Sequence, residues 1–215
     1  MPNNNRYTTL YKSLTFLLLI TGLSACQTPS GVTPAIDQSN QDNALESAPE
    51  KTLDAETLLH NQAISAAMEG KTELALEHFA TLLEKNPFAN KVFTNLGLLY
   101  LQMNDTAEAK KAFLNAIEQD SQDAVAYNHL AIIQRQEGEF KQALFNYYKA
   151  INADPEYASA HLNLGILFDL YLQELPKALE QYLLYQKLTH NKNEDVAKWI
   201  IDLQRRIDNS SNDSP

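Results

Sequence analysis

The chain carries a single thiol, Cys26, at the end of the stretch LITGLSAC. A thiol can form a disulfide, bind a metal, act as a nucleophile or accept a covalent group. A lone cysteine cannot form an internal disulfide, and an unused thiol is a liability in an oxidising compartment. The residues around Cys26 therefore indicate which of these chemistries applies.

Those residues are typical of an exported protein. A polar start with Arg6 and Lys12 precedes the apolar run 13–23, which is too short to span a bilayer as a helix. Small residues then lead to Cys26, as at a signal-peptide cleavage site. Leu-Ser-Ala-Cys resembles the bacterial lipobox. This resemblance implies that a diacylglyceryl group is attached to Cys26, that residues 1–25 are removed as a lipoprotein signal peptide, and that the new amino end is acylated, for example with palmitate. An ordinary signal peptide with a stray cysteine, or a short membrane anchor, is the alternative.

The expected mature chain begins with a tether. Residues 26–53 are rich in polar residues and proline and have few large apolar side chains, so we expect them to be disordered. We expect the same of 209–215. By resemblance to other lipoproteins, a residue other than Asp after the cysteine, here Gln27, favours the outer membrane over the inner, with the remaining domain facing the periplasm.

Charge and motif content limit the possible functions. The full chain has a net charge of −10, and removal of 1–25 takes away two of its 17 basic residues and none of its 27 acidic ones, which gives −12. This balance argues against nucleic acid as a partner. The sequence has no phosphate-binding glycine loop, no zinc-protease motif and no cysteine cluster, so we expect no cofactor, no metal and no enzymatic activity. The alternative is an enzyme with an unrecognised active site, for which His129 and His161 on neighbouring repeats are the best candidate residues.

The body of the chain, 54–192, repeats with a period of 34 residues. We divide it into 56–89, 90–123, 124–157 and 158–192, the last with one extra residue. Matching columns hold Leu59, Phe93, Tyr127 and His161; Gln62, Leu96, Leu130 and Leu164; Ala63, Gly97, Ala131 and Gly165; Ala66, Tyr100, Gln134 and Phe168; Ala75, Ala109, Ala143 and Ala178; and Phe79, Phe113, Tyr147 and Tyr182. Apolar residues within each block recur every three or four positions on both sides of a short turn, which predicts two helices per block.

This pattern resembles the tetratricopeptide repeat (TPR), in which small and aromatic residues hold these columns. The resemblance implies an all-α fold, a right-handed superhelix of about four helix hairpins. We expect 193–208 to cap the open end of the array, with Asn193 at the helix start and an apolar stripe that includes Trp199 and Leu203. Trp199 either packs on the fourth hairpin or anchors a partner.

In TPR proteins the first helix of each hairpin lines a concave groove that binds ligands. By this resemblance, one groove column is aliphatic throughout: Ile64, Leu98, Ile132 and Ile166. Its predicted neighbours are His60, Lys91, Thr94, Leu101, Val125, Asn128, Arg135, Leu162 and Asp169. Such a column suits an amphipathic helix or an extended peptide with apolar anchors, unless the tether, the cap or tight curvature covers it. Some family members clamp a terminal carboxylate, but Val125 and His129 stand where Lys and Arg would be needed, so we do not expect that mode.

These features predict a lipid-anchored periplasmic scaffold that binds protein or peptide partners of the cell envelope. The resemblance to TPR pilotins and pilus-assembly lipoproteins favours assembly of a pilus or secretion machine. Two alternatives are an accessory protein of a TonB-type transport system, whose short repeat proteins include some with a similar terminal Trp-Ile helix, and a docking regulator of peptidoglycan enzymes. A homo-oligomer is also possible.

Overall fold

The chain folds into helical hairpins that follow one another in sequence order. The computed structural model describes residues 54–212, and the segments 1–53 and 213–215, which include the predicted signal peptide, Cys26 and the whole predicted tether, lie outside the described residues. The helices are α2 (Ala55–Met68), α3 (Thr72–Lys85), α4 (Asn90–Gln102), α5 (Thr106–Gln119), α6 (Ala124–Gln136), α7 (Phe140–Ala153), α8 (Ala158–Ile166), the π-helix η2 (Leu167–Leu172), α9 (Leu175–Leu188) and α10 (Glu194–Asn212). No strand occurs between residues 54 and 212.

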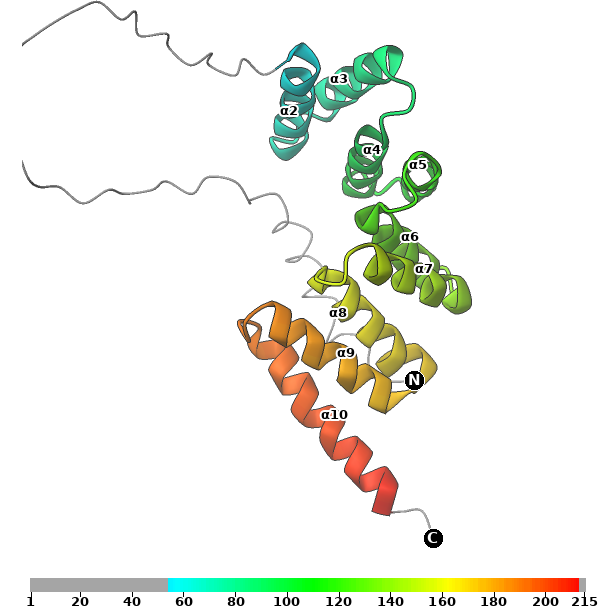
Figure 1. Cartoon of the computed structure of the whole chain (residues 1–215), viewed down its shortest axis with the longest axis vertical. Helices are drawn as coiled ribbons and strands as arrows, with labels where there is room; N and C mark the ends of the chain where they lie inside the picture. The colour runs from blue at the N-terminus through cyan, green and yellow to red at the C-terminus, as the bar shows by residue number, and fades with distance from the viewer. Residues whose placement is uncertain (1–53, 213–215) are drawn as a thin grey trace, which may run out of the picture. The chain divides into compact units, whose positions relative to one another are not determined.

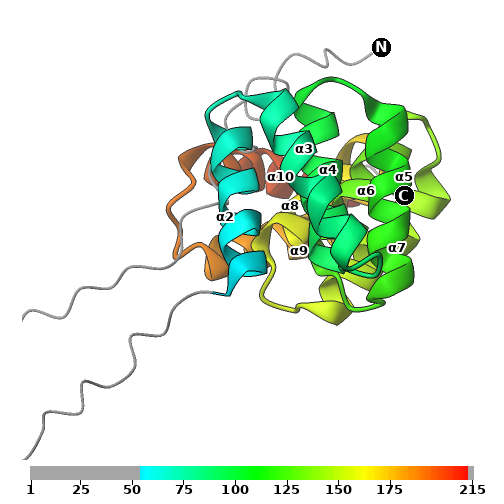
Figure 2. The same cartoon turned by 90° about the horizontal axis from the view of Figure 1, so that it is seen from above.

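Four antiparallel hairpins stack in this body, formed by α2 with α3, α4 with α5, α6 with α7, and α8 with α9 (Figure 1). The first helices α2, α4, α6 and α8 contact one another in succession, and α10 packs on α9. Seen from above in Figure 2, the hairpins lie around an axis rather than in one plane. The predicted all-α fold of TPR-like hairpins is confirmed.

Each hairpin closes through one residue with a left-handed backbone. These residues are Gly70, Asn104, Gly138 and Gln173, with φ between 58° and 82°. In the first three hairpins, the amide of the following residue donates to the carbonyl five positions earlier, as Lys71 N–H does to Ala66 O at 2.8 Å. This bond satisfies a carbonyl at the end of the first helix, and glycine or asparagine tolerates the positive φ that it requires.

The fourth hairpin absorbs its extra residue before the turn, inside the first helix. Here Glu174 N–H donates to Phe168 O at 3.0 Å, one residue further back than in the other hairpins. The π-helix η2 accommodates this longer step, because its turns contain one residue more than α-helical turns. The helical register therefore shifts between Phe168 and Gln173. Pro176 stands in the first turn of α9, where its missing N–H costs no helical hydrogen bond.

Small residues on the first helix of each hairpin face a buried aromatic ring on the second. Phe79, Phe113, Tyr147 and Tyr182 are all buried. A Cβ atom at Gly97 would lie 2.5 Å from Phe113 Cε1, and one at Gly165 would lie 2.6 Å from the Tyr182 ring. The two glycines thus permit close approach of α4 to α5 and of α8 to α9.

Side-chain caps fix several helix starts. The Asp105 carboxylate accepts from Glu108 N–H at 3.1 Å at the start of α5. Asn193 Oδ1 accepts from the amides of Asp195 and Val196, both at 3.1 Å, so α10 begins where the sequence indicated. The helix continues to Asn212, beyond residue 208.

Candidate functional site

The predicted groove residues lie on the first helices of the hairpins and on η2. His60 and Ile64 belong to α2; Lys91, Thr94, Leu98 and Leu101 to α4; Val125, Asn128, Ile132 and Arg135 to α6; Leu162 and Ile166 to α8; and Asp169 to η2. Because α2, α4, α6 and α8 contact one another in succession, these residues lie on neighbouring helices of the array. We call this set the inner face.

The aliphatic column on the inner face changes character along the array. Ile64 is half-buried and packs against the core around Phe79, whereas Leu98, also half-buried, packs against the core around Phe113. Ile132 and Ile166 are only 8% and 5% exposed. A partner would thus reach the first two residues of the column more readily than the last two, and binding at this column stays a prediction.

Polar residues of the inner face connect neighbouring hairpins. Asn95 Nδ2 lies 2.9 Å from His60 Nε2, and Asn163 Nδ2 donates to Asn128 Oδ1 at 3.1 Å. Burial, and to a lesser degree the charge of Lys91, lowers the pKa of His60. The neutral ring can accept a hydrogen bond from the Asn95 amide, so these pairs join α2 to α4 and α6 to α8.

An ion pair ties the last part of the inner face to α10. Asp169 is 2% exposed, and its Oδ1 accepts from Arg206 Nη1 at 2.7 Å. Nearby, the guanidinium of Arg135 lies 5.6 Å from the centre of the Tyr171 ring. The sequence pattern did not indicate this contact between α10 and η2.

The two histidines of the enzyme alternative have separate partners. His161 Nδ1 is 2.8 Å from Gln181 Oε1, and Nε2 is 3.0 Å from the Pro155 carbonyl. His129 stacks on Phe113 with ring centres 5.4 Å apart, and burial lowers its pKa to about 4. Residues 54–212 contain no group of three or more His, Cys, Asp or Glu side chains placed to hold a metal ion.

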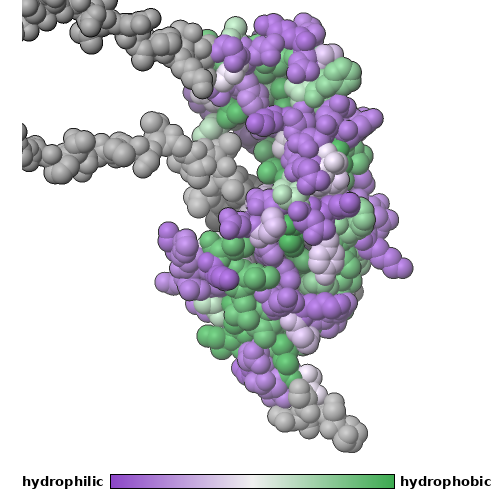
Figure 3. Space-filling view, in the orientation of Figure 1, coloured by the Kyte–Doolittle hydropathy of each residue, from purple (hydrophilic) through white to green (hydrophobic). Residues whose placement is uncertain are grey.

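Trp199 packs on the fourth hairpin. Its ring centre lies 5.8 Å from that of Tyr182 on α9, and Val196 and Leu203 on the same stripe are buried. The packing interpretation of this residue therefore accounts for its position. In Figure 3 hydrophobic residues gather over α9 and α10. Leu183 on α9 and Ile201 on α10 are exposed.

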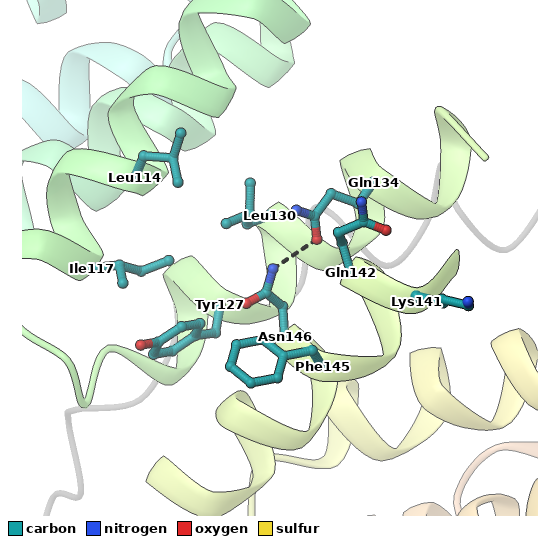
Figure 4. Close-up of a pocket in the computed structure, with 9 residues that line it drawn as sticks. All are labelled: Leu114, Ile117, Tyr127, Leu130, Gln134, Lys141, Gln142, Phe145 and Asn146. Atoms are coloured by element: carbon teal, nitrogen blue, oxygen red, sulfur yellow. Dashed lines mark hydrogen bonds between the residues drawn. The ribbon is translucent and has the colours of Figure 1, made fainter. Parts of the chain in front are cut away.

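The structure also contains a cleft that sequence reasoning missed. It lies between α5 and α7 above α6 and has a volume of about 480 Å³ (Figure 4). Its lining consists of Leu114, Ile117, Tyr127, Leu130, Gln134, Lys141, Gln142, Phe145 and Asn146. We call it the α5–α7 cleft. One sequence signal existed: Gln134 stands in a column where the neighbouring repeats have Tyr100 and Phe168.

Membrane attachment through the described helices is a separate question from lipidation. Among residues 54–212, no helix combines the length and apolar character that a membrane span requires.

Family models match two parts of the chain. A model described as TPR repeat matches residues 133–170, and one described as Tetratricopeptide repeat matches residues 91–123. A curated relative, the probable UDP-N-acetylglucosamine–peptide N-acetylglucosaminyltransferase SPINDLY of Solanum lycopersicum, is 35% identical over 94 residues. These residues are 43% of this chain and 10% of that protein, so the chain spans about a tenth of its length.

Solved structures share the arrangement of the hairpins. The structure of Pseudomonas aeruginosa PilF aligns with a TM-score of 0.64 at 19% identity, and the alignment covers 72% of this chain and 69% of that one. YrrB, described as a TPR protein with an unusual peptide-binding site, aligns with a TM-score of 0.54 at 19% identity over 67% of this chain and 73% of that one. Residues 91–123 and 133–170 thus match TPR repeats, and the similarities to solved structures concern the fold.

Proposed function

We propose that this TPR protein is a non-enzymatic, lipid-anchored adaptor in the bacterial envelope, which holds a protein or peptide partner on its inner face. The observation that carries the proposal is the succession of four hairpins, because each first helix has an aliphatic residue at the same repeat position. These residues are Ile64, Leu98, Ile132 and Ile166. Repeat arrays of this kind present extended surfaces for partners.

The fold supports binding rather than chemistry. TPR domains bind protein and peptide partners, and YrrB is described as having an unusual peptide-binding site. In this chain the polar pairs His60–Asn95 and Asn128–Asn163 are used to join hairpins. The histidines proposed for an enzyme, His129 and His161, each have a partner within the packing. These roles favour a scaffold.

The place in the envelope rests on the amino-terminal sequence. Cys26 after Leu-Ser-Ala supports lipidation, and the tether of 26–53 would separate the repeats from the membrane. About 27 flexible residues have a root-mean-square reach of roughly 30 Å. The fold shared with PilF makes assembly of a pilus or secretion machine the first pathway to test.

Two variants test the anchor and the inner face separately. In Cys26→Ser, we expect loss of radiolabelled palmitate and a shift of the chain from the membrane fraction to the soluble or unprocessed fraction. In Leu98→Ser, which removes a half-buried side chain of the aliphatic column, we expect loss of cross-linked partners with retained helicity. The exposed Phe88→Ser in the loop after α3 is the matched control. An unchanged partner set in Leu98→Ser would retire the inner face as the binding surface.

A further inference from the structure

The third hairpin has a glutamine in a column that is aromatic in the hairpins on either side of it. The column holds Tyr100 in the second hairpin and Phe168 in the fourth, but Ala66 in the first and Gln134 in the third. A glutamine side chain is narrower than a ring, and Gln134 lines the opening between α5 and α7 above α6. Figure 4 shows Gln134 in the cleft beside Asn146.

The floor of the cleft is a hydrogen-bonded amide pair. Asn146 Nδ2 donates to Gln134 Oε1 at 2.7 Å, and both residues are buried. A side-chain amide has two donor hydrogens and an acceptor oxygen, so one mutual bond leaves capacity on each partner for a further hydrogen bond. Apolar walls over a polar floor match the chemistry of a peptide, which presents apolar side chains and backbone amides together.

The rim of the cleft is apolar and exposed. Phe145 is 59% exposed on α7, and Leu114 is 48% exposed on the facing α5. Tyr148, one turn from Phe145, is also exposed. Aromatic side chains of this kind are enriched at protein interfaces, because they bury large areas with few rotatable bonds.

The α7 side of the cleft is positive in a chain that is strongly negative overall. Helix α7 carries Lys141 and Lys149 and no acidic residue. Lys149 Nζ lies 5.4 Å from the centre of the Phe145 ring, so its charge sits beside the exposed aromatic residue. On α5, Lys110 and Lys111 are already paired with Glu137 and Glu108. The charge of α7 therefore selects for acidic groups on whatever enters the cleft.

We propose that the α5–α7 cleft is a second docking site, separate from the inner face, for an acidic amphipathic peptide segment of a partner protein. An apolar side chain of that segment would occupy the cleft beside Gln134, where the neighbouring repeats have Tyr100 and Phe168 in the same column. Its Asp or Glu residues would face Lys141 and Lys149. Residues of this site lie on the second helices and on the outward side of α6, so it can be occupied together with the inner face.

The sequence itself supplies a variant that closes the cleft. In the second hairpin, the positions equivalent to Gln134 and Asn146 hold Tyr100 and Ala112. The double variant Gln134→Tyr, Asn146→Ala therefore copies a pair that the fold already accommodates. It fills the space with a ring and removes both members of the amide pair together, so that neither is left without its partner.

The probe is a fluorescein-labelled 16-residue helical peptide with Leu and Phe on one face and Glu on both flanks. A second peptide has the same apolar residues and Lys in place of each Glu. Binding to the purified full chain is measured by fluorescence anisotropy. We expect the acidic peptide to bind at least tenfold more tightly than the basic one, about 1.4 kcal/mol. We expect the double variant and Phe145→Ala each to lower the affinity for the acidic peptide at least tenfold. Phe88→Ala should leave that affinity unchanged.

Three results would overturn the proposal. One is that the acidic and basic peptides bind with equal affinity, or that neither peptide binds at about 1 mM protein, which is the weak end of specific recognition. Another is native affinity in the double variant when its thermal unfolding matches that of the native chain. The third is a concentration-dependent dimer, detected by sedimentation and lost in the double variant, which would assign the cleft to a second copy. Leu98→Ser should leave peptide binding unchanged, so failure at one surface does not imply failure at the other.

Discussion

The contact between Gly97 and Phe113 allows a prediction whose sign depends on the partner residue. A Cβ atom at position 97 would lie 2.5 Å from Phe113 Cε1 and 2.7 Å from Cδ1 and Cζ. Carbon atoms pack at about 3.5–4.0 Å, so the ring would have to withdraw by about 1 Å. Phe113 is fully buried, with Ala116, Leu130 and Ile133 in the same core cluster, so little space exists for such a shift.

Two opposing effects set the magnitude for Gly97→Ala. Overpacking of a filled core costs roughly 1–3 kcal/mol, whereas replacing a helical glycine by alanine contributes about 0.8–1 kcal/mol of stability. We therefore expect Gly97→Ala to lower the free energy of unfolding by about 1 kcal/mol. In a Phe113→Leu background the ring is absent, and the same substitution should raise the free energy of unfolding by up to about 1 kcal/mol.

The assay is urea unfolding of the four chains of this double-mutant cycle. Far-UV circular dichroism reports the whole array, and the fluorescence of Trp199, the only tryptophan, reports its carboxyl end. Ala131→Gly is the matched control, because it removes a methyl group from the same column in the next hairpin and should cost about 1 kcal/mol. If Gly97→Ala stabilises the chain while Phe113 is present, the close-packing argument for this column is refuted.

The remaining predictions concern pH, the cap and the hairpin turns. Folding lowers the pKa of His129 from its usual value near 6.5 to about 4, so between these pH values the unfolded chain binds more protons than the folded chain. The contribution of His129 to the free energy of unfolding should therefore be complete above pH 6.5 and fall as the pH drops toward 4. In urea titrations, His129→Gln should flatten this pH profile. Trp199→Ala should lower the free energy of unfolding by about 2 kcal/mol, less than a fully buried ring, because Trp199 is half-buried against Tyr182; an unchanged urea midpoint would contradict this packing. Gln173→Gly should raise the midpoint of thermal unfolding, since glycine adopts the φ of 58° without strain, whereas Gly138→Ala should lower it.

The hairpins could be predicted because their information is repeated. Four registers agree on the small column of Gly97 and Gly165 and on the buried rings of Phe113 and Tyr182, and a 34-residue period with helical spacing leaves few other folds. The caps at Asp105 and Asn193 form between neighbouring residues, so the local sequence is enough to predict them.

The features that were missed depend on departures from the repeat. The π-helix η2 places the extra residue before the turn, and a period alone cannot say where in a block an insertion is absorbed. The Arg206–Asp169 pair joins residues 37 positions apart, and Arg206 lies beyond the last repeat, where the period gives no information. The α5–α7 cleft is lined by Gln134, which departs from the aromatic residues of the repeats on either side, and the sequence alone does not show that an opening forms there.

The central claim, that the inner face holds a partner, can be tested most directly by photo-cross-linking in cells. A photoreactive amino acid replaces Lys91, an exposed residue of the inner face on α4, or Glu84, an exposed residue at the end of α3, as the control position. The account predicts a defined cross-linked product from position 91, absent from position 84 and lost when Leu98→Ser is added. Identical products from positions 91 and 84, or none from position 91, would contradict it.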